Sequence, residues 1–127
     1  MARILIIDDS AFTRRQLRKV LLSLGHEVME AASGAEGLTM LESHTPAYVV
    51  TDLLMPEMDG FDFIDAVRKR TDKLRKTPIL VLSADVQEAS RYRTSELGAE
   101  RFLNKPVKAE MIRAALEEID SQQQAAG

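Results

Sequence analysis

The stretch AYVVTDLLMPEMDG, residues 47–60, begins as a strand-forming run and ends as a loop. Its apolar part stops at Asp52, and the Met-Pro and Asp-Gly pairs that follow favour a loop. The pattern predicts a buried strand with a carboxylate at its carboxyl end. A single acid in that position is often only a turn former, so its role depends on what the rest of the chain places beside it.

Four further strand-like runs alternate with segments of helical spacing. The runs cover residues 3–7, 26–32, 77–83 and 100–105. The helical segments cover residues 10–24, 33–43, 61–70 and 85–97, with a last one around 111–119. Strands that alternate with helices, without hairpin signals, predict an α/β fold with five βα units. We expect a doubly wound, five-stranded parallel sheet covered on both faces.

Two of the predicted helices begin with a capping-box pattern. Ser33 is followed three residues later by Glu36, and Asp85 is followed three residues later by Glu88. In a capping box the first side chain accepts a hydrogen bond from the backbone of the fourth residue, and the acid reaches back. We therefore expect helices to begin at both places.

The chain has 127 residues, which suits one domain with a proper core. We expect residues 1–121 to form that domain and residues 122–127 to form a polar tail. A net charge of −3 gives no reason to expect nucleic-acid binding, and the absence of cysteine excludes disulfide and thiolate chemistry. The N-terminal apolar run is too short for a signal peptide or a membrane span, so we expect a cytoplasmic protein that does not associate with a membrane.

Polar side chains gather at the predicted carboxyl ends of the strands. They are Asp8 and Asp9 after the first strand, Asp52 after the third, Ser83 after the fourth and Lys105 after the fifth. Taken singly, each has an ordinary explanation as a helix cap, a turn former or a solvated charge. Ligands of open parallel sheets bind beyond these strand ends, so the joint pattern predicts one polar crevice.

Three carboxylates in one crevice need a counter-charge. At an effective dielectric constant of 20, two like charges about 4 Å apart repel by roughly 4 kcal/mol. Clustered oxygen ligands suit Mg²⁺, with Mn²⁺ as a substitute, and Lys105 adds a second positive charge. Such a pocket could receive a phosphoryl group, with Asp52 as the nucleophile.

These residues resemble the receiver domain of bacterial two-component response regulators. The resemblance rests on Asp8-Asp9, the Asp52 of TDLLMPEMDG, Ser83-Ala84 and Lys105-Pro106, and it runs from about Arg3 to Ile119. It implies a flavodoxin-like fold with strand order 2-1-3-4-5. With no attached output domain, the chain looks like a stand-alone regulator similar to the chemotaxis response regulator.

The resemblance assigns the phosphoacceptor and the metal ligands. It implies that Asp52 accepts a phosphoryl group from a phosphohistidine on a partner histidine kinase or phosphotransfer protein. Asp9 and Asp52 would bind Mg²⁺, Asp8 would contribute mainly through water, and the backbone carbonyl of Leu54 would complete the protein ligands. Because Leu54 is apolar and cannot orient water, we expect slow self-dephosphorylation.

The resemblance also implies how the signal leaves the site. Lys105 would pair with Asp52 and then with the phosphoryl oxygens, and its peptide bond to Pro106 would be cis. The Ser83 hydroxyl would bond the phosphoryl group and shift inward, and the aromatic Phe102 would turn inward with it. The surface of residues 85–97, 100–105 and 111–119 would then control an unknown downstream protein. The expected protein is a signalling switch rather than an enzyme, a monomer that could dimerise when phosphorylated.

Three other functions remain as alternatives. A phosphatase of the haloacid-dehalogenase type resembles an Asp-x-Asp-x-Thr pattern after its first strand, whereas this chain has Asp8-Asp9-Ser10-Ala11. A nucleotide or flavin module would be expected to carry a glycine-rich phosphate loop, and no such sequence occurs. A degenerate receiver used only for protein interaction is disfavoured, because all the expected chemical groups are present.

Overall fold

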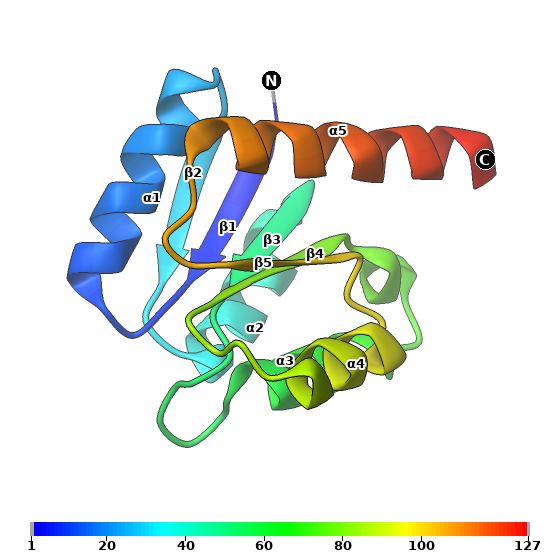
Figure 1. The fold of residues 1–127 in the computed structure, drawn as a ribbon. Helices are drawn as coiled ribbons and strands as arrows, with labels where there is room; N and C mark the ends of the chain where they lie inside the picture. The colour runs from blue at the N-terminus through cyan, green and yellow to red at the C-terminus, as the bar shows by residue number, and fades with distance from the viewer. Residues whose placement is uncertain (1, 127) are drawn as a thin grey trace.

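The structure is a computed structural model that describes residues 2–126. Strands and helices alternate along these residues (Figure 1). In chain order they are β1 (Arg3–Ile7), α1 (Ala11–Ser23), β2 (Glu27–Ala31), α2 (Gly34–His44), β3 (Tyr48–Thr51), α3 (Gly60–Arg68), the short 3₁₀ helix η1 (Lys73–Lys76), β4 (Ile79–Ser83), α4 (Glu88–Leu97), β5 (Arg101–Asn104) and α5 (Ala109–Ala126).

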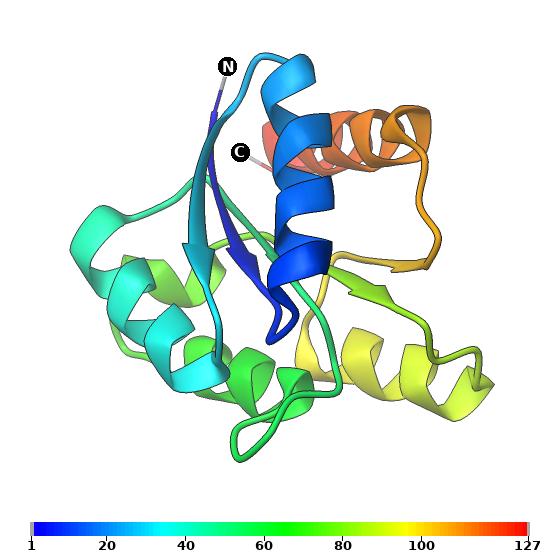
Figure 2. The same ribbon diagram turned by 90° about the vertical axis from the view of Figure 1, so that its left-hand side faces the viewer.

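The five strands form one parallel sheet in the order β2-β1-β3-β4-β5. This confirms the expected α/β fold and the strand order 2-1-3-4-5. Helices α1 and α5 cover one face of the sheet, and α2, α3 and α4 cover the other (Figure 2). From β1 the chain adds β2 on one side, and it then adds β3, β4 and β5 on the other side of β1. A crevice is therefore expected beyond the carboxyl ends of β1 and β3, where the strand order reverses.

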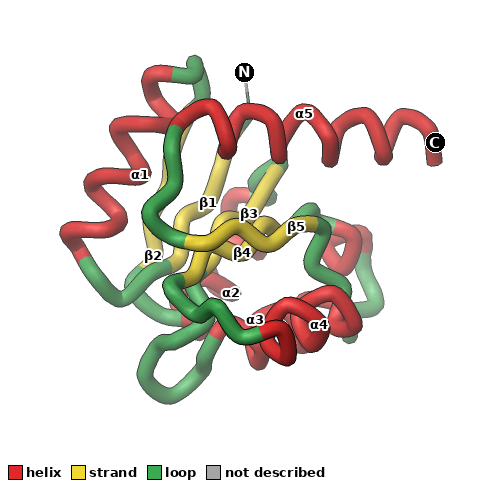
Figure 3. Tube along the Cα trace, viewed as in Figure 1, coloured by secondary structure: helices red, strands yellow, loops and turns green. Residues whose placement is uncertain are grey.

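Alternate residues of each strand supply two separate cores. In β1, Ile4 and Ile6 pack toward α1 and α5, whereas Leu5 and Ile7 pack toward α2 and α3. All four side chains are fully buried, as expected for a strand covered on both faces. The apolar runs therefore hold the strands in the middle layer and leave only the strand ends for polar groups. Figure 3 shows loops at these ends.

One of the two predicted capping boxes is present in part, and the other prediction is wrong. Ser33 caps α2 by accepting a hydrogen bond from the Glu36 amide at 3.1 Å, although the Glu36 carboxylate reaches the amide of Ala32 instead of Ser33. Helix α4 begins at Glu88, and Gln87 stands at its N-cap without a side-chain hydrogen bond. The Asp85 carboxylate instead accepts hydrogen bonds from the Gln87 amide and the Ser90 hydroxyl.

Helix α5 crosses the expected start of a polar tail at residue 122. It continues to Ala126, and Gly127 lies outside the described residues. Arg101 in β5 donates hydrogen bonds to Glu118 at 2.9 Å and to Gln122 at 3.3 Å, which fastens this part of α5 to the sheet edge. The Gln and Ala residues of this segment are also good helix formers, so its polar composition is compatible with a helix that extends past residue 121. No helix within residues 2–126 is long and apolar enough to cross a membrane.

Candidate functional site

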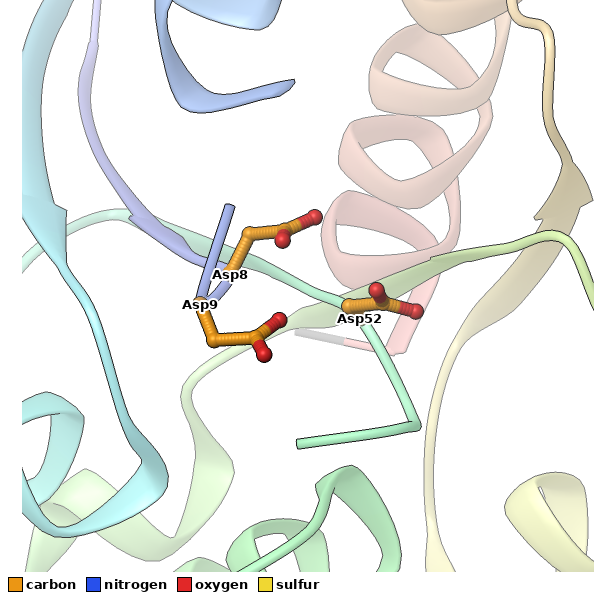
Figure 4. Close-up of side chains that lie close together, drawn as sticks. All are labelled: Asp8, Asp9 and Asp52. Atoms are coloured by element: carbon orange, nitrogen blue, oxygen red, sulfur yellow. The ribbon is translucent and has the colours of Figure 1, made fainter. Parts of the chain in front are cut away.

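Three carboxylates meet at the carboxyl ends of β1 and β3. Asp8 and Asp9 follow β1, and Asp52 follows β3, where its amide donates a hydrogen bond to the Ile7 carbonyl at 3.0 Å. One carboxylate oxygen from each acid lies within 4.8 Å of the others. Figure 4 shows the three side chains close together, although the strand before Asp8 and Asp9 and the strand before Asp52 are far apart in the sequence.

Lys105 lies directly after β5, so the carboxyl end of a third strand also contributes to this cluster. Its Nζ lies 3.0 Å from Asp8 Oδ2 and 3.2 Å from Asp52 Oδ2, so one ammonium group bridges two carboxylates. The Lys105 amide also donates to the Ser83 carbonyl at 2.9 Å, and the peptide bond to Pro106 is cis, as expected. The structure therefore brings together four of the predicted site residues, Asp8, Asp9, Asp52 and Lys105.

Burial and neighbouring charges shift the pKa of both partners in the Asp52–Lys105 pair. Burial raises the pKa of the Asp52 carboxyl above its ordinary value, and Asp8 adds to the rise, while Lys105 and the Leu53 amide oppose it. For Lys105, burial lowers the pKa, but hydrogen bonds and charge interactions with Asp8 and Asp52 outweigh burial and raise it. One lysine thus offsets only part of the repulsion among three acids.

The two acids after β1 have different surroundings. Asp8 is buried, and both of its oxygens are engaged, one by the Ser10 amide at 2.9 Å and one by Lys105. Asp9 is exposed. The Asp52 carboxylate lies between these cases in burial, and both of its oxygens are engaged, Oδ1 by the Leu53 amide at 2.7 Å and Oδ2 by Lys105. An all-oxygen donor set with open space at Asp9 fits a hard cation such as Mg²⁺.

The loop after Asp52 is fixed by close backbone packing. The Gly60 amide donates to the Leu53 carbonyl at 2.8 Å. A Cβ at Gly60 would meet the Asp52 carbonyl oxygen and would lie 2.8 Å from the Leu53 Cα, so only glycine fits there. The side chain of Leu54 projects from this loop with 66% of its surface exposed. The loop thus presents backbone groups beside the acid cluster while Leu54 faces outward.

The two predicted switch residues lie on the neighbouring strands β4 and β5. Ser83 is fully buried at the end of β4, and its Oγ accepts a hydrogen bond from the Asp85 amide at 3.1 Å. Phe102 in β5 is half-buried, and the guanidinium group of Arg91 lies 4.8 Å from its ring centroid. Both residues are therefore connected to α4 or to the loop that precedes it.

Asn104 is a residue of this region that the sequence analysis missed. Its side chain amide donates to the Asp85 carbonyl at 2.7 Å and accepts a hydrogen bond from Arg91 at 2.8 Å. The available signal was a polar side chain at the end of a short strand, next to Lys105. That signal names a position at the strand end but no partner, because both partners come from other elements.

Comparisons with known proteins agree with this geometry. Residues 4–117 match the family model described as response regulator receiver domain. The chain is 34% identical over 115 residues to the chemotaxis protein CheY of Bacillus subtilis, which covers 90% of this chain and 93% of that protein. It is 35% identical over 117 residues to the probable transcriptional regulator ycf27 of Porphyridium aerugineum, and it spans only 47% of that regulator.

Solved structures show the same architecture. The chemotaxis protein CheY4 of Vibrio cholerae superposes with a TM-score of 0.85 at 33% identity, covering 93% of this chain and 98% of that one. A response regulator receiver domain protein from Clostridium thermocellum superposes with a TM-score of 0.89 at 26% identity and covers 100% of both chains. The matching region therefore extends over the acid cluster, Ser83 and Lys105.

Proposed function

The chain belongs to the response regulator receiver domain family, and from that premise we propose that it is a single-domain signalling switch phosphorylated on Asp52. Phosphorylation of an aspartate by a kinase is the standard function of this family. The observation that carries the assignment is the position of Asp52 within the cluster of three acids. Asp52 contacts the Lys105 ammonium group at 3.2 Å and keeps 14% of its side chain exposed, whereas Asp8, the other partner of Lys105, keeps only 5%.

The phosphotransfer step requires little beyond position and charge. An oxygen of the Asp52 carboxylate attacks the phosphorus of a phosphohistidine on a histidine kinase or phosphotransfer protein. A P–O bond forms, the P–N bond breaks, and the imidazole leaves with the electron pair and takes up a proton. Lys105 stays beside the reacting carboxylate and neutralises charge on the transferred group, as phosphoryl transfer requires. The chain promotes only its own phosphorylation and slow dephosphorylation.

We assign the metal ligands to the acid cluster. Asp9 and Asp52 would hold Mg²⁺ or Mn²⁺ with the backbone carbonyl of Leu54, and Asp8, which is buried, would act mainly through water. The ion supplies charge neutralisation for the phosphoryl oxygens. The exposure of Asp9 and the fixed backbone between Asp52 and Gly60 support this assignment.

The phosphodonor would approach over α1. An apolar groove of about 490 Å³ runs from Phe12 and Leu17 on α1 to Lys105 and Pro106 beside the acid cluster. Phe12 is 64% exposed, although it is a large apolar side chain. The groove thus leads a partner surface directly to the phosphoacceptor region.

The output surface would be formed by α4, β5 and α5. A phosphoryl group adds negative charge and acceptor oxygens at Asp52, and Lys105, which already contacts this carboxylate, and Ser83 would respond to it. Phe102 would turn inward with Ser83, and the changed surface would control a downstream protein. We expect the protein to be a cytoplasmic monomer that can dimerise on phosphorylation, without direct binding of nucleic acid.

A labelling experiment tests the assignment. The chain is incubated with Mg²⁺ and acetyl phosphate, and intact mass spectrometry is used to look for one added phosphoryl group. We expect labelling that chelation with EDTA prevents and that Asp52→Asn abolishes. Unchanged labelling of the Asn variant would refute Asp52 as the acceptor, and continuous hydrolysis of a small phosphomonoester would instead favour the phosphatase alternative.

A further inference from the structure

Asn104 connects the loop after β4 with helix α4. Its side-chain nitrogen donates hydrogen bonds to the Asp85 carbonyl at 2.7 Å and, at greater length, to the Ser83 carbonyl at 3.4 Å. Its side-chain oxygen accepts a hydrogen bond from Arg91 Nη2 at 2.8 Å. A single side chain at the end of β5, next to Lys105, therefore fixes the position of two other elements.

Arg91 extends this connection to the aromatic residue of β5. Its guanidinium carbon lies 4.8 Å from the centroid of the Phe102 ring, within the range of a cation–π interaction. Its Nη1 also donates to the Phe102 carbonyl at 3.4 Å. Arg91 thus covers the ring in its half-buried position, and an inward turn of Phe102 would give up the ring contact.

Asp85 completes the connection at the buried hydroxyl group. Its amide donates to Ser83 Oγ at 3.1 Å, and its carboxylate accepts hydrogen bonds from the Ser90 hydroxyl and the Gln87 amide. These hydrogen bonds hold the pKa of the Asp85 carboxyl below its ordinary value, and the bond from Ser90 contributes most. The backbone and side chain of Asp85 together link Ser83 to the first turn of α4.

The contacts form one chain, from Ser83 through Asp85, Asn104 and Arg91 to Phe102. We propose that Arg91 and Asn104 are positioning residues of a latch that stabilises the unphosphorylated conformation. The proposal rests on the function proposed above. When a phosphoryl group on Asp52 draws the Ser83 hydroxyl toward it, the segment with Asp85 moves as well. The hydrogen bonds of Asn104 then lengthen, and Phe102 is released from Arg91.

A latch of this kind opposes phosphorylation, and its loss favours it. A ligand that prefers one of two conformations binds more tightly when the competing conformation is destabilised. Asn104→Ala removes the bond from Arg91 and the bonds to the Asp85 and Ser83 carbonyls. Arg91→Ala removes the ring contact, the bond to Asn104 and the long bond to the Phe102 carbonyl. Both variants should therefore bind a phosphoryl mimic more tightly while their unloaded forms become less stable.

Beryllium fluoride with Mg²⁺ serves as the probe, because it mimics a phosphoryl group on a carboxylate without turnover. Its dissociation constant is measured by calorimetric titration for the wild type, Asn104→Ala and Arg91→Ala, and thermal unfolding is measured for each unloaded chain. We expect about fivefold tighter binding for Asn104→Ala, the factor that corresponds to one net hydrogen bond, and about twofold tighter binding for Arg91→Ala.

Arg93→Ala is the matched control. Arg93 lies two residues from Arg91 on the same helix, and its guanidinium carbon lies 4.0 Å from the centroid of the Phe61 ring. The variant therefore loses an arginine and an aromatic contact from α4 without touching the chain of contacts between Ser83 and Phe102. Its affinity for beryllium fluoride should equal that of the wild type.

The opposite signs separate a latch from an ordinary structural role. Substitution of a residue that only supports the fold lowers the unfolding temperature and does not raise the affinity, whereas substitution of a latch residue lowers the unfolding temperature and raises the affinity. Equal or weaker binding by Asn104→Ala, or the same gain in Arg93→Ala, overturns the latch. If Asn104→Ala does not fold, the exposed Arg91 carries the same test. Failure of the wild type to bind beryllium fluoride would overturn the proposed function as well.

Discussion

Helices α3 and α4 lie on the same face of the sheet, but the sequence secures them in different ways (Figure 1). Helix α3 buries a large apolar surface, and α4 buries only the small polar residues Ser90 and Thr94. The buried residues of α3 are Gly60, Phe61, Phe63, Ile64 and Val67. Elements with few buried apolar contacts open at lower free energy, so α4 is the helix that can move at least cost.

The ends of the two helices differ as well. Helix α3 begins with a capping box between Asp59 and Asp62, while the N-cap of α4, Gln87, makes no side-chain hydrogen bond. The other end of α4 is fastened to α3, because Arg68 donates to the Gly98 carbonyl at 2.8 and 3.0 Å. The loop after Asp52 thus precedes the helix that begins with a capping box, and the proposed switch loop precedes the helix whose N-cap residue makes no side-chain hydrogen bond.

Core truncation should give the largest difference between the two helices. Phe63 of α3 is fully buried, and Phe63→Ala should lower the free energy of unfolding by about 3–5 kcal/mol through lost burial and a cavity. Tyr92 of α4 is 70% exposed, and Tyr92→Ala should change it by less than about 0.5 kcal/mol. Urea unfolding measures both, and comparable losses in the two variants would show that α4 is secured as firmly as α3.

The contrast between the helices also marks what the sequence could predict. Strand ends are set by local apolar patterning, and parallel strands bring their carboxyl ends to one edge, so the meeting of Asp8, Asp9, Asp52 and Lys105 followed from the sequence. The apolar spacing in α3 also predicted that helix, because the residues that recur at helical spacing are the ones that pack into the core.

The region of α4 could not be predicted to the same depth. The spacing of Asp85 and Glu88 matches a capping box, but the Asp85 side chain is taken up by Ser90 and the helix starts three residues later. The partners of Asn104 come from a loop and a helix that precede it in the sequence, so local patterns carry no trace of them. Few apolar residues in α4 leave its start to such tertiary contacts.

Removal of the fastening at the end of α4 should have the second largest effect. Arg68 forms a partly buried ion pair with Glu100 at 2.7 Å and donates to the carbonyls of Arg75, Thr77 and Gly98. Arg68→Met should cost about 2–3 kcal/mol, because carbonyls and a carboxylate lose their donor. Hydrogen exchange should then rise in the last turn of α4.

Arg70→Met is the control for that substitution. Arg70 pairs with Asp72 and Glu42 on the surface, where ion pairs add little stability. We expect urea unfolding close to that of the wild type and no change in exchange at α4. If both variants showed faster exchange along the whole of α4, the contacts of Arg68 would not be a specific anchor of the last turn of this helix.

Removal of the caps should give a smaller difference. Asp59 accepts a hydrogen bond from the Asp62 amide at 2.9 Å, so Asp59→Ala should lower the free energy of unfolding by about 1 kcal/mol. Gln87→Ala should change it by less than about 0.5 kcal/mol, since no cap bond is lost. Equal effects of the two substitutions in urea unfolding would show that the N-caps of α3 and α4 contribute equally to stability.

The smallest change should come from Asp52, the proposed phosphoacceptor, and it should have the opposite sign. Burial, with a further contribution from Asp8, raises the pKa of Asp52 above its ordinary value of 3.8. A raised pKa means that the folded chain binds the proton more tightly than the unfolded chain. The stabilisation from Asp52 is therefore fully present below pH 3.8 and is lost as the pH rises through the raised pKa.

At pH 7 in Mg²⁺-free buffer, the ionised Asp52 should therefore destabilise the chain, and Asp52→Asn should raise the temperature of unfolding. The gain should be modest because Lys105 offsets part of the repulsion and keeps Asp8 as a partner in the variant. It should shrink as the pH of both samples is lowered toward 3.8, because the wild-type carboxyl, with its raised pKa, progressively takes up its proton. A variant less stable than the wild type at pH 7, or a gain that grows on acidification, would mean that the ionised Asp52 carboxylate does not destabilise the folded chain.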